Sequence, residues 1–332
     1  MSEEFAVIVC TPDVDGAVAG ALAGRAAAGR AEVLVFGSDV VAEFFRPEMQ
    51  RKLPRGYDLA FCGHSLLALD WDGRPVRPVL MDRLRAAGRP MRWFSGARWA
   101  PEDRSAVAHL IGEGNLCVGD GAVTASELVR RTLCAPSDAY AERLVRLARD
   151  DLTGRERRAW GDGASRVLAA LRADAEQMAA AVGLLMEERD GEMIARFDEA
   201  VRRWEEDTRT DARRQAANVR AMGGVRVVLL ALEPARHAWW AETSRCAREE
   251  AGAELSVCVL KGRHVLLAAA DETARLDVEG WIGYVTDMRP GCRLPGGASG
   301  GVALHVPGLE HDPRLPEEVL RLLEEGVHLL HG

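Results

Sequence analysis

Short apolar runs alternate with helical patterns along the first third of the chain. The runs are rich in β-branched and aromatic residues and predict strands over 5–10, 32–36, 58–62 and 91–94. The segments between them predict helices over 16–29, 39–45 and 79–87. Repeated strand–helix units are typical of a parallel, doubly wound sheet, so we expect an α/β domain in this part of the chain.

Helical patterns dominate the middle of the chain. Two helices are predicted over 122–134 and 137–151. The pattern then stays almost continuously helical from about 165 to 222, where the pair Asp190-Gly191 separates two helices. Residues 192–221 are strongly charged with a sparse apolar stripe, which is typical of a solvated helical face. We therefore interpret 191–222 as a helical linker between two domains.

The last third of the chain predicts a smaller α/β domain. Strands are expected near 225–231, 255–260 and 264–270, with a helix over 237–251. The turn Lys261-Gly262-Arg263 predicts a hairpin, so this sheet should be mixed rather than parallel. The patterns thus indicate a doubly wound domain at 1–190, the helical linker at 191–222 and a C-terminal domain at 223–332.

Composition and charge narrow the class of protein. A chain of 332 residues suits two domains, and its net charge of −8 argues against a broad electrostatic grip on duplex nucleic acid, although a local basic groove stays open. The seven cysteines form no CxxC pair and read as reduced core residues. No signal peptide or membrane-spanning run is evident, so we expect a cytoplasmic protein with no membrane partner.

Two carboxylates follow the first predicted strand. The strand ends at Thr11-Pro12, and Asp13 and Asp15 come directly before Gly16 and an alanine-rich helix. Ligands of open α/β sheets bind at the carboxyl ends of strands, and carboxylate oxygens suit Mn²⁺ or Mg²⁺. Alternatively, the two aspartates cap the helix and shape the turn.

A glycine cluster marks the C-terminal domain. It contains Gly296, Gly297, Ser299, Gly300 and Gly301. Clustered glycines let backbone N–H groups converge on an anion, and the Ser299 hydroxyl adds a donor. The other interpretation is a flexible loop before a strand. The cluster is no Walker loop, because no Gly-Lys-Ser/Thr follows it.

Five stretches, in this order, resemble the motifs of the DHH phosphoesterases. The first stretch resembles the family's His-x-Asp-x-Asp-Gly, the second an apolar strand ending in Asp, the third Trp-Phe-Asp-His-His-x-Trp, and the fourth an Asp motif. The fifth resembles the glycine-rich signature of the DHH-associated C-terminal domain. The stretches are 11–19, 57–64, 92–99, 147–151 and 296–301. Because they extend over nearly the whole chain, their order identifies it as a divergent DHH-like protein.

The resemblance implies a two-Mn²⁺ site that activates a water for phosphoester hydrolysis, but most ligand positions differ. Thr11 stands for a histidine, His64 for an aspartate, and Ser95-Gly96-Ala97 for Asp-His-His. The ligands that remain to be considered are Asp13, Asp15, His64 and Asp150. The resemblance further assigns substrate binding to Arg98 and the glycine cluster.

Two hypotheses follow. In the first, the fold is kept without the chemistry, and an impaired or inactive protein binds a nucleotide, a nucleic acid end or a protein partner in an interdomain cleft. A second copy, as a homodimer, or a catalytically intact relative is the expected protein partner. In the second, a reduced Mn²⁺ or Mg²⁺ site still hydrolyses nucleotides or short oligonucleotides. The missing ligands favour the first, because metal sites tolerate such losses poorly.

Overall fold

The computed structural model divides the chain into two compact units. The described residues are 5–27, 30–53, 57–66, 75–87, 91–153, 163–263, 265–270, 276–289, 291–292, 297–298, 301–307, 309 and 317–331. The first unit contains those up to Val201, and the second contains those from Arg202 onward. The predicted domain boundaries, with a linker at 191–222 between domains at 1–190 and 223–332, stay a prediction.

A parallel sheet forms the centre of the first unit, as predicted. Its strands are β1 (Phe5–Cys10), β2 (Arg30–Val35), β3 (Asp58–Cys62), β4 (Arg92–Ser95) and β5 (Leu116–Val118). Their order across the sheet is β2-β1-β3-β4-β5, and every neighbouring pair is parallel. In this order the direction of strand addition reverses between β1 and β3, so ligands are expected at the carboxyl ends of these two strands.

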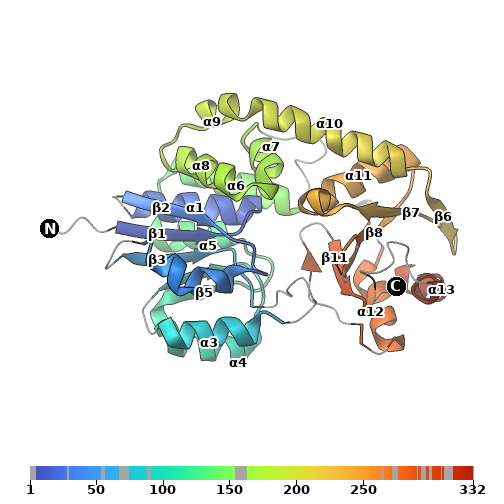
Figure 1. Cartoon of the computed structure of the whole chain (residues 1–332), viewed down its shortest axis with the longest axis horizontal. Coiled ribbons are helices and arrows are strands. Elements are labelled where there is room, and N and C mark those ends of the chain that lie inside the picture. The colour runs from blue at the N-terminus through green and yellow to red at the C-terminus, as the bar shows by residue number, and fades with distance from the viewer. Residues whose placement is uncertain are drawn as a thin grey trace. The chain divides into compact units, whose positions relative to one another are not determined.

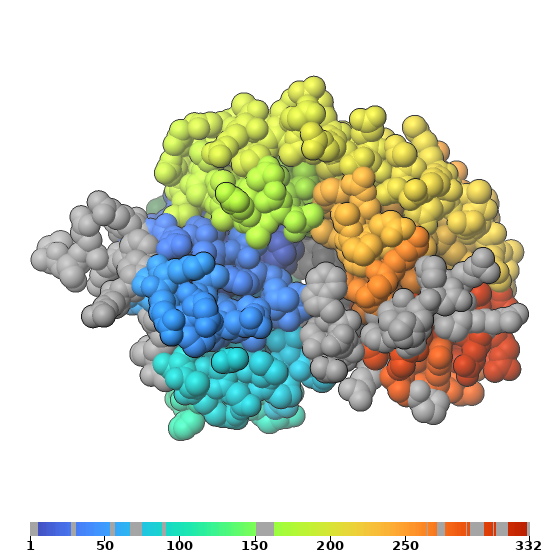
Figure 2. Space-filling model, viewed as in Figure 1, coloured from blue at the N-terminus to red at the C-terminus, as the bar shows by residue number. Residues whose placement is uncertain are grey.

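Helices cover both faces of this sheet (Figure 1). One face carries η1, α3 and α4, and the other carries α1 and α5, with α6 and α8 packed outside them. Figure 2 shows these layers of the first unit from outside, with α3 and α4 in cyan and α8 and α9 in yellow-green. The bounds are α1 (Val14–Ala26), η1 (Val41–Phe45), α2 (Pro47–Gln50), α3 (Arg77–Ala87), α4 (Pro101–Ile111), η2 (Glu113–Asn115), α5 (Ala125–Leu133), α6 (Ala139–Thr153), α7 (Gly163–Ala170), η4 (Leu171–Ala173), α8 (Ala175–Met186) and α9 (Asp190–Arg196).

The core between the sheet and α3 and α4 is aromatic. Val7 and Val9 of β1 contribute to it with Phe61 of β3 and Trp93 of β4, and all four are fully buried. The Phe61 and Trp93 rings stack with their centroids 5.1 Å apart. Side chains alternate between the two faces of a strand, and both faces here are covered, so the strands read as continuous apolar runs.

The almost continuous helical pattern predicted after residue 165 is divided into α7, η4, α8, α9 and α10 (Asp198–Gln215), and its last residues form a strand. The predicted separation of two helices near Asp190-Gly191 lies just before Asp190, where Glu188 has a left-handed φ of 60° between α8 and α9. Helix α10 ends before β6 (Val219–Met222), which the prediction had made helical. Residues 219–222 are extended because the turn at Gly223 and Gly224 pairs β6 with β7. The helix α4 and the strand β5 were not predicted.

A mixed sheet forms the centre of the second unit, as predicted. Its order is β10-β11-β9-β8-β7-β6, in which only β7 and β8 pair in parallel among the described residues. The remaining bounds are β7 (Val225–Leu232), η5 (Pro234–Trp239), α11 (Trp240–Ala251), β8 (Leu255–Leu260), β9 (Val265–Ala270), α12 (Val278–Met288), β10 (Gly297–Ala298), β11 (Gly301–His305), α13 (Glu317–Glu325) and η6 (Gly326–His331). One core packs α12 and α13 on this sheet around the fully buried Trp281. No helix in the described part of the chain is long and apolar enough to cross a membrane.

Candidate functional site

The turn after β1 is held by Asp13. This residue is the N-cap of α1, and its Oδ1 accepts the backbone N–H of Gly16 at 2.7 Å. Aspartate is favoured at this position because its side chain satisfies an amide that has no partner within the helix. A Cβ on Gly16 would lie 1.9 Å from Thr11 Oγ1, so this turn requires glycine. Asp13 therefore caps α1, which is the alternative to metal binding that the sequence left open.

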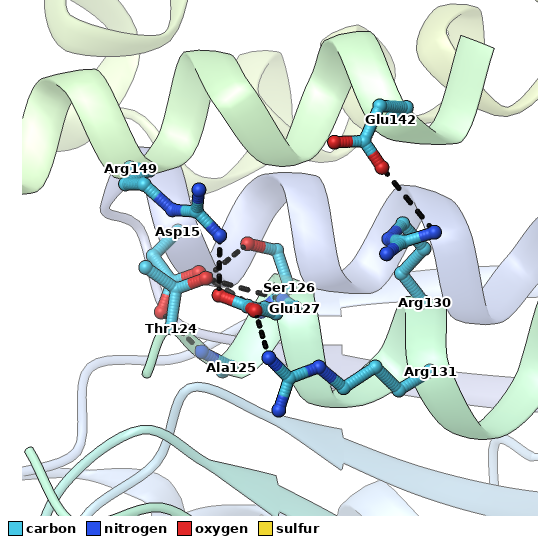
Figure 3. A network of polar contacts seen from close by, with 9 residues as sticks. All are labelled: Asp15, Thr124, Ala125, Ser126, Glu127, Arg130, Arg131, Glu142 and Arg149. Atoms are coloured by element: carbon cyan, nitrogen blue, oxygen red, sulfur yellow. Dashed lines mark hydrogen bonds and ion pairs between the residues drawn. The ribbon is translucent and has the colours of Figure 1, made fainter. Parts of the chain in front are cut away.

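The Asp15 carboxylate binds the beginning of another helix. Its Oδ2 accepts the N–H of Ala125 at 2.8 Å, and its Oδ1 accepts the N–H of Ser126 at 2.9 Å (Figure 3). Both amides belong to the first turn of α5, whose N-cap is Thr124. A negative group at a helix N-terminus is stabilised by the partial positive charge there. Asp15 thus joins α1 to α5.

Burial and the neighbouring Asp13 carboxylate raise the pKa of Asp15 to about 6. The amide and hydroxyl of Ser126 and the amide of Ala125 act in the opposite direction, because they stabilise the charged form. Asp15 is therefore mostly ionised at neutral pH, but it can be protonated in mild acid.

The first turn of α5 also lies directly against Gly96, which follows β4. A Cβ on Gly96 would lie 2.5 Å from the carbonyl oxygen of Val123 and 3.1 Å from the amide nitrogen of Ala125. The Gly96 carbonyl in turn accepts the N–H of Gly121 at 3.0 Å. In the resemblance, Gly96 stands where the family has the first histidine of Asp-His-His. Backbone of the chain itself occupies the space that such a side chain would need.

The His64 side chain lies in the aromatic core. It is fully buried, and its ring meets the Phe61 ring edge-on with centroids 5.6 Å apart. Its backbone carbonyl accepts the Trp93 indole N–H at 3.1 Å. Burial lowers the pKa of His64 to about 3, against the opposing effect of the Val9 carbonyl. The imidazole is therefore neutral at pH 7.

The metal-ligand role of Asp13, Asp15, His64 and Asp150 stays a prediction. Asp13, Asp15, His64 and Asp150 all lie in the described part of the chain, where no three His, Cys, Asp or Glu side chains are grouped so that they could hold a metal ion. Asp150 lies on α6, whereas the other three follow β1 or β3 in the sequence. The donor set does not fit a two-metal centre, because Thr11 and Ser95 offer only hydroxyl groups and Gly96 and Ala97 offer no side-chain ligand atom.

Two hydroxyl groups at the carboxyl ends of the strands are buried without a hydrogen-bond partner among the described residues. They are Thr11 Oγ1, next to β1, and Ser95 Oγ, at the end of β4. Both stand where the resembled family has metal ligands. A hydroxyl can donate to an anion or accept from an amide, but it is a weak metal ligand.

The predicted substrate-binding residues fall in both units. Arg98 is exposed after β4, and its charge is one of the causes, behind the Ala122 amide, that lower the pKa of Asp120. In the second unit, Gly297 pairs with Val302 in the antiparallel β10–β11 ladder, and Gly301 also belongs to that ladder. The other three cluster residues, Gly296, Ser299 and Gly300, lie outside the described residues. Their role in anion binding stays a prediction.

Sequence reasoning missed a charged network around Glu127. This buried carboxylate forms ion pairs with Arg131 on α5 and Arg149 on α6 (Figure 3). The spacing Thr124-x-x-Glu127 is that of a capping box, and Glu127 and Arg131 are four residues apart on one helix face. Both signals were present in the sequence, whereas the contact with α6 depends on the packing of the helices.

Three solved structures are similar to this chain. RecJ from Thermus thermophilus in complex with Mn²⁺ has a TM-score of 0.62 at 11% identity, over 98% of this chain and 52% of that one. The DHH domain of a protein assigned to a family of ribosomal proteins has a TM-score of 0.61 at 13% identity, over 99% and 88%. An exonuclease RecJ bound to manganese has a TM-score of 0.51 at 12% identity, over 98% and 90%.

The chain thus spans about half the length of the Thermus thermophilus RecJ. No protein-family model matches the sequence, and no curated protein does. At such low identities a structural likeness concerns the fold and not the chemistry. The chain therefore has the two-domain fold that RecJ and the DHH-domain protein share.

Proposed function

We propose that this protein binds a nucleotide or a nucleic acid end and does not hydrolyse it. The binding part of the proposal is supported by the fold shared with RecJ, which is an exonuclease and so acts at nucleic acid ends. It is also supported by the strand order, since β1 and β3 meet at the point where ligands of such sheets bind.

One observation carries the absence of hydrolysis. Both oxygens of Asp15 accept amides of the first turn of α5. Each amide uses one lone pair of an Asp15 oxygen in a charged hydrogen bond that contributes roughly 1.5–3 kcal/mol, so a metal at Asp15 would have to compete with these amides for the charge of the carboxylate. We expect the metal-free arrangement to be the stable one, because Thr11 also replaces the histidine of the first motif and leaves a two-metal site short of a ligand there.

The alternative is a reduced site that still binds Mn²⁺ or Mg²⁺ and hydrolyses nucleotides or short oligonucleotides. It is supported by the manganese in the RecJ structures and by the retention of both Asp13 and Asp15. The proposal of binding without hydrolysis also includes a protein partner, either a second copy or a catalytically intact relative, and sedimentation of the purified protein would test for it.

A calorimetric Mn²⁺ titration of the metal-stripped protein tests the proposal, with RecJ as the positive control. We expect no saturable binding, and no Mn²⁺-dependent hydrolysis of bis(p-nitrophenyl) phosphate. Saturable Mn²⁺ binding that disappears in Asp13→Asn, together with metal-dependent turnover, would instead establish the alternative. Asp13→Asn is the matched variant because asparagine keeps the N-cap while it removes the charge.

A further inference from the structure

A single buried carboxylate holds two arginines from different helices. Glu127 has only 10% of its side chain exposed, and it pairs through Oε1 with Arg131 and through Oε2 with Arg149 at 2.7 Å. The two arginine side chains are 56% and 52% exposed. Each guanidinium group is therefore bonded to Glu127 (Figure 3), while about half of each arginine side chain stays exposed.

Glu127 is the carboxylate bonded directly to both arginines. Burial acts to raise the pKa of Glu127, but Arg149 and Arg131 outweigh burial, so the pKa is lowered and the group is ionised at pH 7. The next carboxylate in the network, Glu142, pairs with Arg130 at 3.3 Å. Glu142 and Asp150 also act on Arg149 at longer range. Two guanidinium groups thus share one directly bonded carboxylate.

Another ion-pair network in the chain has the opposite composition, with one arginine between two carboxylates. In the second unit, Arg236 meets two carboxylates, Asp207 at 2.7 Å and Asp211 at 3.4 Å. All three of those side chains are less than one third exposed, so that contact holds the structure together. At Glu127, by contrast, two arginines share one carboxylate. Both arginines are half-exposed, so a second anion can approach them.

We infer that Arg131 and Arg149 bind a terminal phosphate of a nucleotide or oligonucleotide, with Glu127 as the positioning residue. A guanidinium presents a planar fork that matches two phosphate oxygens, and prior fixing of the two forks lowers the entropy cost of binding. This inference rests on the proposed function, since it names the part of the ligand that is recognised.

The test uses the full chain and fluorescence anisotropy of a short, 3′-labelled oligodeoxythymidine with either a 5′-phosphate or a 5′-hydroxyl. Arg131→Ala and Arg149→Ala are compared with the wild type. Arg85→Ala is the control, because Arg85 is also exposed but pairs with one exposed carboxylate, Asp82. We expect each of the first two substitutions to weaken binding of the phosphorylated strand about tenfold and to reduce its salt dependence. The control should bind like the wild type.

The outcomes separate this inference from the proposed function. If the wild type prefers the phosphorylated strand and Arg149→Lys recovers only part of the affinity that Arg149→Ala loses, the inference stands, because lysine keeps the charge without the fork. Equal binding of both strands, or equal binding by wild type and alanine variants, overturns the inference and leaves the proposed function in place. No binding of either strand by a folded wild type overturns both.

Discussion

Single residues at the strand ends show why a familiar pattern can have a different role. Asp13 and Asp15 keep the spacing of a metal motif, yet one caps α1 and the other binds the amides of α5. The same carboxylate chemistry serves both purposes, because an oxygen lone pair accepts an N–H group as readily as it ligates a hard cation. What decides between the roles is the partner that the fold brings close.

His64 gives a prediction at this scale. Its folded-state pKa is about 3, below the ordinary value of 6.5, so its contribution to stability is full above pH 6.5 and is lost as the pH falls towards 3. The loss amounts to roughly 5 kcal/mol at most, at about 1.4 kcal/mol for each pH unit. Urea unfolding at several pH values should therefore show a smaller acid loss for His64→Gln than for the wild type.

Asp15 provides a check on the His64 prediction, because its pKa of about 6 is shifted in the opposite direction, above the ordinary value. Its contribution is fully present below about pH 4 and is lost as the pH rises through 6. Removal of its charge in Asp15→Asn should therefore shift the pH dependence in the direction opposite to that of His64→Gln. Parallel shifts in the two variants would contradict the buried, neutral state assigned to His64.

At the scale of elements, the docking of α5 depends on the absence of a side chain at Gly96. In Gly96→Ala the new Cβ would lie 2.5 Å from the Val123 carbonyl, so the first turn of α5 must move. We expect a loss of about 1–3 kcal/mol in the free energy of unfolding, the range for an overpacked site. Hydrogen exchange should also accelerate at the Ala125 and Ser126 amides.

The matched control is Gly183→Ala in α8, where an added Cβ meets nothing within 4 Å. Alanine is the better helix former by about 1 kcal/mol, so this variant should be as stable as the wild type or more stable. If Gly96→Ala behaved like Gly183→Ala, the close approach of α5 to β4 would be refuted.

Most helices and strands were predictable from the sequence, and the incorrect predictions have physical causes. Strands β1, β3, β8 and β9 lie where the apolar runs put them, because strands buried on both faces leave a continuous signal. Strand β6 was missed because a charged helix precedes it and pairing with β7 determines its extended state. Helix propensity is a weak signal that such pairing overrides.

At the scale of the whole molecule, the fold was predictable from the order of motifs, whereas the site was not. The strand order and the mixed second sheet follow from patterns that extend over many residues. The bond between Asp15 and α5 joins residues 110 positions apart, and nothing local to either end signals it. Contacts of that kind arise from packing, and so a sequence motif can persist while its chemistry changes.

The division into units gives the last prediction. Helix α10 contacts the rest of the second unit: Asp207 and Asp211 pair with Arg236, Arg213 pairs with Glu250 at 3.3 Å, and Gln215 accepts the Ala231 amide at 2.6 Å. A fragment of residues 198–332 keeps these contacts and β6, whereas 223–332, the domain predicted from the sequence, loses them. We expect the longer fragment to unfold cooperatively in urea, and the shorter one to unfold at a clearly lower midpoint or without cooperativity.

Loss of β6 also exposes the edge of β7, whose amides and carbonyls then lack partners, so the shorter fragment should associate at high concentration. Restoring residues 216–222 alone would return the edge strand without α10, which separates the two causes. If that intermediate fragment matched 198–332, the edge strand would account for the whole effect. If it matched 223–332, the α10 contacts would set the boundary, and the helix would belong to the second unit instead of linking two domains.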